Sequence, residues 1–182
     1  MKRFLLLAVM FLLVGGMANA NMITLDGTVA DSGLPGSVDY QYFTIDIADW
    51  VTLETFTDAF DPEMYLFVDD GALDGSDYLE SDDDSGTASA YGYYNSFIEI
   101  FLNPGSYIAA VADYELSLLE AVSGINDSTA IGIGTGSYQL QISAGQATVT
   151  SAAPVPEPAT MLLLGTGLAG LVGVSRKKSA KA

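Results

Sequence analysis

An acidic stretch near the middle of the chain holds the side chains best suited to chemistry. It begins at residue 69 and reads DDGALDGSDYLESDDDSG. Calcium takes about six to eight oxygen ligands, commonly from Asp carboxylates and from carbonyls in glycine-rich turns. The spacing is not that of an EF-hand, so two interpretations stay open, a calcium site and a solvated surface loop. The candidate ligands for calcium are Asp61, Asp69, Asp82, Asp83 and Asp84.

Three tyrosines form a second candidate site. Tyr91, Tyr93 and Tyr94 lie in the segment SAYGYYNS. In an exposed loop, their aromatic faces would stack on sugar rings. Packing in the core or along turns is the alternative. Exposure of these rings would therefore favour binding of a polysaccharide.

The composition excludes several kinds of active site. The chain contains no His and no Cys, so Ser-His and Cys-His nucleophiles and zinc sites of His or Cys type cannot form. Two Asp-Ser-Gly sequences, at 31–33 and 84–86, match the short motif of aspartic proteases but lack its hydrophobic flanks and are typical of turns. We expect no enzymatic activity. A secreted hydrolase that uses paired carboxylates remains the alternative.

Charge is divided unevenly along the chain. All six basic residues lie in the two terminal segments, whereas residues 21–156 hold 22 of the 23 acidic residues and no Lys, Arg or His. Nucleic acid is a poor partner for this region, because binding phosphate needs Lys or Arg. Self-repulsion keeps such a region in solution but penalises its compact state, and a divalent cation would relieve that penalty.

The N-terminal segment has the order of features of a secretory signal peptide. Lys2 and Arg3 precede an apolar run of eleven residues, and the small residues Ala18 and Ala20 follow it. This pattern predicts recognition by signal peptidase, removal of residues 1–20 and export of the rest.

The C-terminal segment predicts a short transmembrane helix. Residues 159–174 are uncharged, and the cluster Arg176, Lys177 and Lys178 that follows would hold the terminus on the cytoplasmic side. Prolines just before the helix would keep the chain extended and accessible to a protease.

The sequences VPEPAT, MLLLGTGLAGLVGV and RKK occur in this order at the C-terminal end. Together they resemble the PEP-CTERM sorting signal of Gram-negative surface proteins, which would occupy residues 156–182. The resemblance implies transient insertion in the inner membrane, cleavage by an exosortase, and release or attachment at the cell surface, often beside exopolysaccharide. An uncut membrane anchor is the alternative. The residues that carry the resemblance are Pro156, Glu157, Pro158, Arg176, Lys177 and Lys178.

Short alternating apolar segments between turn residues predict the fold of the exported region. In YFTIDI, for example, Phe43, Ile45 and Ile47 would share one face. Such strands favour one antiparallel β-sandwich domain, jelly-roll-like, over residues 21–143. The small and polar residues 144–155 are predicted to form a flexible linker.

The order FDPEMYLFVDDG, LESDDDSG, SFIEIFLNPGSYIAAVADY and GSYQLQIS resembles the bacterial pre-peptidase C-terminal type of domain. This resemblance implies a small jelly-roll sandwich. In that family such domains aid secretion, adhesion or binding, and some of them bind calcium. We expect the module to stand alone here, without a preceding peptidase domain.

These features predict a non-enzymatic protein, secreted or at the cell surface, that is a binding or structural component of the extracellular or exopolysaccharide matrix. A calcium-stabilised adhesion module and the hydrolase are the alternatives. Signal peptidase and exosortase are the expected processing partners, and exopolysaccharide or a surface protein is a candidate ligand. Calcium is the candidate cofactor.

Overall fold

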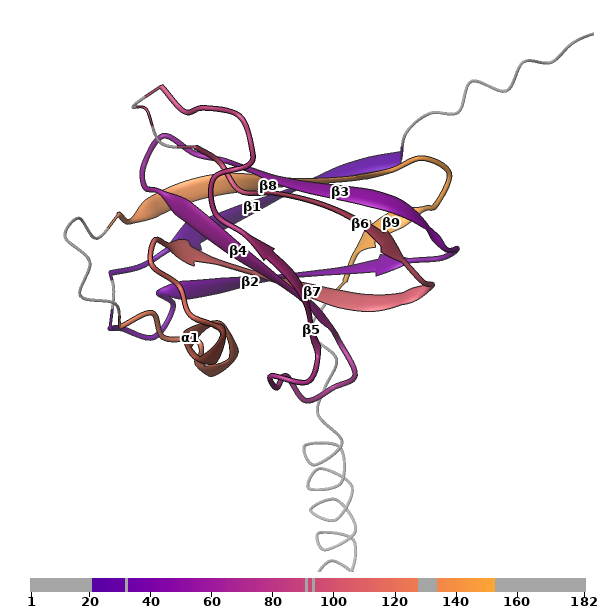
Figure 1. Ribbon diagram of the computed structural model, residues 1–182, viewed down its shortest axis with the longest axis horizontal. Helices are drawn as coiled ribbons and strands as arrows, with labels where there is room; N and C mark the ends of the chain where they lie inside the picture. The colour runs from indigo at the N-terminus through magenta and orange to yellow at the C-terminus, as the bar shows by residue number, and fades with distance from the viewer. Residues whose placement is uncertain (1–20, 32, 91, 93, 128–133, 153–182) are drawn as a thin grey trace, which may run out of the picture.

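The computed structural model describes residues 21–31, 33–90, 92, 94–127 and 134–152. These residues form two antiparallel sheets packed face to face (Figure 1), so the predicted all-β sandwich is confirmed. One sheet has the strand order β1-β8-β3-β6 and the other has the order β5-β4-β7-β2-β9. The elements are β1 (Asn21–Val29), β2 (Val38–Ile45), β3 (Asp49–Phe56), β4 (Pro62–Val68), β5 (Tyr78–Asp82), β6 (Phe97–Leu102), β7 (Gly105–Asp113), α1 (Leu118–Ser123), β8 (Gly136–Ala144) and β9 (Val149–Ser151).

Alternation of side chains along the strands builds the core between the sheets. In β3, Val51 and Leu53 are fully buried, whereas Trp50, the second residue of the strand, points outward and is exposed. Phe43 of β2 is buried in the same core, as its alternating sequence predicts. Ile47 departs from that prediction, because it lies beyond the end of β2 and is exposed.

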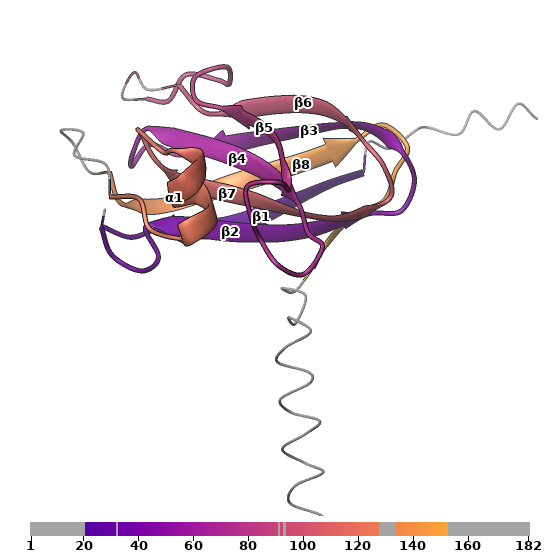
Figure 2. The same cartoon turned by 60° about the horizontal axis from the view of Figure 1, so that its bottom comes forward.

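β7 is buried on both of its faces, which explains its continuous apolar sequence. Residues 107–113 are all buried, with Val111 in the core between the sheets and Ala112 in a second apolar cluster beneath α1. The helix begins with a capping box formed by Ser117 and Glu120. Figure 2 shows α1 lying against the five-stranded sheet. Within the described residues, no helix covers the four-stranded sheet.

The prediction of a linker over residues 144–155 is wrong for most of that segment. Residues 149–151 form β9, which pairs with residues 43–45 of β2. The Ala152 N–H then donates to the Tyr42 carbonyl at 2.8 Å. A three-residue edge strand carries too short an apolar pattern to be recognised by periodicity. The sandwich therefore extends to at least residue 152 and does not end at 143.

Two carboxylates hold the turn between β8 and β9. Asp49 Oδ2 accepts hydrogen bonds from the N–H groups of Gln146 (2.5 Å) and Ala147 (2.9 Å). Asp46 Oδ1 accepts one from the Thr148 N–H (2.6 Å). These backbone donors favour the ionised carboxylates and lower the pKa of both groups. Backbone amides thus pair with acidic side chains in a region that has no basic residue.

Several predicted features lie outside the described residues. These are the signal peptide (1–20, including Ala18 and Ala20) and the apolar helix and basic end of the sorting signal (156–182). Within the part of the chain that the structure describes, no helix is long and apolar enough to cross a membrane.

The burial of β9 leads to a stability prediction. Val149 is 2 % exposed and packs in the main core, so Val149→Ala should lower the free energy of unfolding by about 1.5 kcal/mol, at about 0.8 kcal/mol per buried CH₂. Ser151→Ala, on the exposed side of the same strand, is the matched control and should have little effect. Urea denaturation of both variants makes the measurement. Equal stability of the two variants would show that this segment behaves as a linker.

Candidate metal centre

Three of the five candidate ligands meet at one end of the five-stranded sheet. Asp61 directly precedes β4, and Asp83 and Asp84 directly follow β5. Because β4 and β5 are antiparallel neighbours, with Met64 opposite Asp82, the start of one lies beside the end of the other. One carboxylate oxygen from each of the three aspartates lies within 4.8 Å of the other two. We call these three residues the Asp61 cluster.

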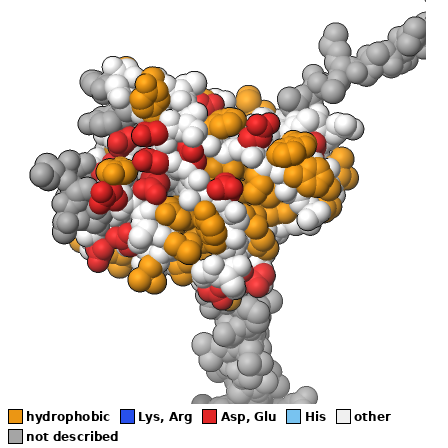
Figure 3. Space-filling view, in the orientation of Figure 1, with side chains coloured by type: hydrophobic (Ala, Val, Ile, Leu, Met, Phe, Trp, Pro, Cys, Tyr) orange, Lys and Arg blue, Asp and Glu red, His pale blue; other side chains and the backbone are white. Residues whose placement is uncertain are grey.

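Two oxygen atoms of the Asp61 cluster are buried and have no hydrogen-bond partner. They are Asp61 Oδ1 and Asp83 Oδ1. Buried polar atoms in proteins are nearly always paired, and a buried charge without a partner is costly. Residues 21–156 contain no Lys or Arg, and on the face shown in Figure 3 many acidic side chains and no basic ones are seen. Among the described residues, the two oxygens therefore have neither a hydrogen-bond donor nor a cation beside them.

Burial and mutual repulsion raise the pKa values of Asp61 and Asp83 in the Asp61 cluster. Burial, followed by the charges of Asp84, Asp61 and Asp82, raises the pKa of Asp83 to about 6. Burial and the charges of Asp84 and Asp113 raise the pKa of Asp61. Both effects penalise the ionised form. A bound cation would reverse them, since metal ligands bind as carboxylates.

Two further carboxyl groups lie around the cluster and are bonded to the backbone. Asp113, at the end of β7, accepts from the N–H groups of Asp61 (3.1 Å) and Gly134 (2.7 Å). Glu63 accepts from the Leu116 N–H at 2.6 Å, and burial raises its pKa to about 7. Asp113 is not recognisable as a site residue from the sequence, because it follows an apolar strand and lies far from the acidic stretch. Strand pairing with the start of β4 brings it here.

The other two candidate ligands do not join the cluster. Asp69 lies just beyond the opposite end of β4, eight residues and roughly 26 Å of extended strand from Asp61, and its carboxylate accepts from the Gly71 N–H (3.2 Å). Asp82 is adjacent in sequence, but its Oδ2 accepts from the N–H groups of Ser85 (2.9 Å) and Phe97 (2.8 Å). The side chain of Asp82 thus ties the start of the β5–β6 connection to β6.

The tyrosine segment is described in part. Tyr94 is 50 % exposed and forms an isolated β-bridge with Ala88, so its ring is accessible to a ligand. Tyr91 and Tyr93 lie outside the described residues.

Fold and site together define a small, acidic β-sandwich domain with a cluster of carboxylates fit for a divalent cation. Residues 154–177 match the family model of the PEP-CTERM protein-sorting motif. The chain therefore carries the sorting signal that its sequence predicts, with Pro156, Glu157 and Pro158 inside the match. This signal implies export across the membrane and processing by an exosortase.

The comparison with solved structures finds a domain of the second family that the sequence resembles. It is the pre-peptidase C-terminal domain of a collagenase from Bacillus anthracis, with a TM-score of 0.42 and 15% sequence identity over 70% of this chain and 88% of that chain. A comparison with curated proteins finds no match to this chain.

The raised pKa values predict how stability depends on pH in a calcium chelator. The pKa rises from 3.8 to about 6 for Asp83 and from 4.5 to about 7 for Glu63. At a pH between the unfolded and the folded pKa of each group, the folded protein retains a proton that the unfolded chain has released. The stability that these protons contribute is therefore fully present below about pH 4 and is lost as the pH rises to about 7. The free energy of unfolding should therefore fall from pH 5 to pH 8.

Urea denaturation at four pH values in this window makes that measurement. Asp83→Asn should flatten part of the decline, because the amide has no proton to lose. Asp31→Asn removes the same charge from an exposed position and should leave the slope as it is. Stability that rises from pH 5 to pH 8 would contradict the interpretation.

Proposed function

We propose that Asp61, Asp83 and Asp84 bind a calcium ion. Oxygen ligands lie about 2.3–2.6 Å from calcium, so ligands that share one ion lie within about 5 Å of one another. The three carboxylate oxygens meet this requirement, at 4.8 Å or less. The observation that carries the proposal is the pair of buried oxygens, Asp61 Oδ1 and Asp83 Oδ1, that have no hydrogen-bond partner.

The donor set favours calcium over other common metals. It consists of carboxylate oxygens on two chain segments and includes no nitrogen or sulfur ligand, which disfavours zinc and copper. Magnesium demands a nearly ideal octahedron and gives up its water reluctantly, whereas calcium accepts irregular sets of oxygens. Water and backbone carbonyls would complete the coordination.

The proposed role of the ion is structural. It joins the start of β4 to the start of the β5–β6 connection, two segments that otherwise repel each other through Asp61, Asp83 and Asp84. With no Lys or Arg in residues 21–156, an external cation is the direct means of relieving this repulsion. Calcium would thus couple the folding of the domain to the calcium concentration outside the cell.

At the level of the cell, we propose a non-enzymatic role as a binding or structural component of the extracellular matrix of a Gram-negative bacterium. The sorting motif supports export and processing, and the exposed Tyr94 supports contact with a ligand. The competing hydrolase needs one carboxyl group that keeps its proton beside the substrate. The carboxyl groups with the most strongly raised pKa values, Asp83 and Glu63, belong to the cluster and its surroundings, which suits a metal site better than a substrate groove.

The calcium proposal predicts a selective rise in thermal stability. At a calcium concentration about 100-fold above the dissociation constant, binding should add about 2.7 kcal/mol, which raises the Tm of a domain of this size by about 8 °C. Magnesium should produce a much smaller rise. Asp61→Asn and Asp83→Asn should abolish the calcium effect, while Asp31→Asn, with the same change of charge, should retain it. A rise in Tm that is equal for calcium and magnesium, or equal in all variants, would show that the cations only screen the repulsion between acidic side chains and do not bind at the Asp61 cluster.

The sorting motif predicts the fate of a processing variant. Replacement of Pro156, Glu157 and Pro158 by Ala should leave an uncleaved, longer form in the membrane fraction of a host with an exosortase. Ser151→Ala, which lies before residues 154–177 that match the sorting motif, is the control and should be processed normally. Immunoblots of membrane and medium fractions make the comparison, and equal processing of both variants would argue against exosortase cleavage.

A further inference from the structure

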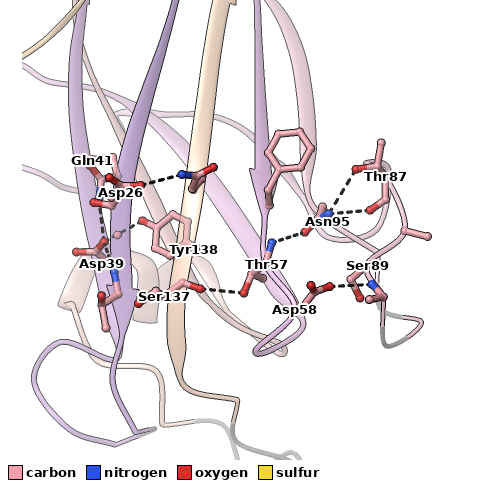
Figure 4. A pocket seen from close by; sticks show the side chains of 16 residues that line it. Asp26, Asp39, Gln41, Thr57, Asp58, Thr87, Ser89, Asn95, Ser137 and Tyr138 are labelled. Carbon is pink, nitrogen blue, oxygen red and sulfur yellow. Dashed lines mark hydrogen bonds between the residues drawn. The ribbon is translucent and has the colours of Figure 1, made fainter.

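A groove of about 900 Å³ opens on the surface of the sandwich. It crosses the ends of β1, β8 and β3, and the connection between β5 and β6 forms its far wall (Figure 4). Asp39 and Gln41 lie at one side of the groove, and Thr87 and Ser89 at the other. The volume lies in the upper part of the range of about 300–1,000 Å³ for small-molecule sites. The groove shares no residue with the Asp61 cluster.

On the side of the groove formed by Asp39 and Gln41, three hydrogen bonds hold the Asp39 carboxylate in place. Its Oδ2 accepts from Gln41 Nε2 (2.9 Å), the Tyr138 hydroxyl (2.9 Å) and the Thr28 N–H (3.3 Å). All three bonds end on one oxygen, so Oδ1 is left to accept from a ligand. Gly27 permits the close approach, because a Cβ there would lie 2.3 Å from the Tyr138 ring and 2.5 Å from Asp39 Oδ2. The close contact of β1 with the Tyr138 ring and the Asp39 carboxylate therefore requires glycine at position 27.

The floor and the far wall are also held in place. Gln139 Nε2 donates to Asp26 Oδ1 at 3.1 Å, and the Ala90 N–H donates to Asp58 Oδ1 at 2.8 Å. The side-chain amide of the buried Asn95 accepts from the Thr57 N–H, just after β3, and donates to the Thr87 carbonyl of the far wall. Polar groups that are oriented before binding lose little entropy when a ligand arrives.

The chemistry of the lining selects the ligand class. Carboxylates, amides and hydroxyls line the groove, and no cation is among them. Phosphates and uronates would meet Asp26, Asp39 and Asp58 without any Lys or Arg to bind them. A ligand with many hydroxyl groups can donate to the carboxylates and can both donate to and accept from the amides. The lining therefore suits a neutral sugar.

An exposed aromatic pair lies on the outward face of the same sheet. Trp50 and Phe101 are opposite each other on β3 and β6, their ring centroids are 5.9 Å apart, and they are 59% and 52% exposed. Phe56 of β3 lines the groove, six residues or about 20 Å along the strand from Trp50. Between them the face is polar, with the hydroxyls of Thr52 and Ser143 bonded at 2.7 Å. Rings exposed in this way offer flat apolar faces for sugar rings.

We propose that the groove and the Trp50–Phe101 pair form one binding track for a neutral polysaccharide chain that lies along β3. The inference rests on the proposed binding role of the protein and names its ligand class and the surface that takes it. An anionic polymer would find no cation on this face, and a protein partner would find only separate apolar side chains, the Trp50–Phe101 pair and Met22, amid polar ones. A chain of neutral sugars matches both the polar groove and the isolated rings.

The single tryptophan of the chain is a built-in reporter for this track, because it is Trp50. The exported protein is titrated in chelator with three neutral probes, dextran, mixed-linkage β-glucan and galactomannan, and with alginate as an anionic probe. At least one neutral polymer should change the Trp50 emission saturably, and alginate should not. Affinity electrophoresis in the same polymer then gives the dissociation constants of variants, including those that lack the reporter.

Trp50→Ala and the double variant Gln41→Ala, Gln139→Ala should each weaken binding about tenfold, equivalent to roughly 1.4 kcal/mol. Leu119→Ala on α1 and Gln146→Ala in the β8–β9 turn are exposed controls and should bind normally.

Failure of all three neutral polymers to bind, variants that bind as the controls do, or release of reducing ends from the polymer would each overturn the proposal. The calcium-dependent melt of the same sample is independent of this track. Its persistence would leave the calcium proposal standing if polysaccharide binding fails.

Discussion

The structure depends on one constraint, which is that the acidic side chains of residues 21–156 have no basic side chain to pair with. Many of them bind backbone N–H groups instead. Asp49 holds the β8–β9 turn, Asp58 holds the segment between β5 and β6, and Asp113 joins the start of β4 to residues after α1. Charge-assisted bonds of this kind are stronger than neutral ones, so the loops are organised by the residues that would otherwise repel one another. The buried Oδ1 atoms of Asp61 and Asp83 differ from these carboxylates, because no backbone N–H group donates to them.

The two outward faces of the sandwich differ for a reason that lies in β7. Its continuous apolar sequence leaves Ile108, Ala110 and Ala112 facing away from the main core, and α1 covers them. The four-stranded sheet has alternating strands, so its outward side chains are mostly polar, and its largest exposed apolar side chains are Met22, Trp50 and Phe101. In the described part of the chain, this sheet is left uncovered and is available for binding. One sheet therefore stabilises the domain on both faces, while the other can present a ligand track without loss of core.

The sequence predicts the sandwich well, because alternation in segments such as β3 is a strong local signal. It also places Asp61, Asp83 and Asp84 among the five candidate calcium ligands. It does not predict which acids converge. That depends on strand pairing, which brings Asp61 to Asp83 and leaves Asp69 at the far end of β4. The groove escapes sequence analysis for the same reason: Asp39 and Tyr138 lie 99 residues apart and meet only because β1 has a glycine between them. Short β9 is missed because three residues give no measurable period.

Because β9 belongs to the sandwich, the segment between the domain and the sorting motif is short. Once Ala152 is bonded to the Tyr42 carbonyl, only residues 153–155 separate the sandwich from the sorting motif at Pro156. Four peptide steps span at most about 14 Å even when fully extended. A linker that began at residue 144 would have allowed about three times that reach. Until the sorting signal is removed, Pro156 therefore lies within about 14 Å of the edge formed by β2 and β9. Gln41, which lines the groove, is next to Tyr42 on this edge, so the proposed ligand track begins beside the strands that lead to the sorting motif.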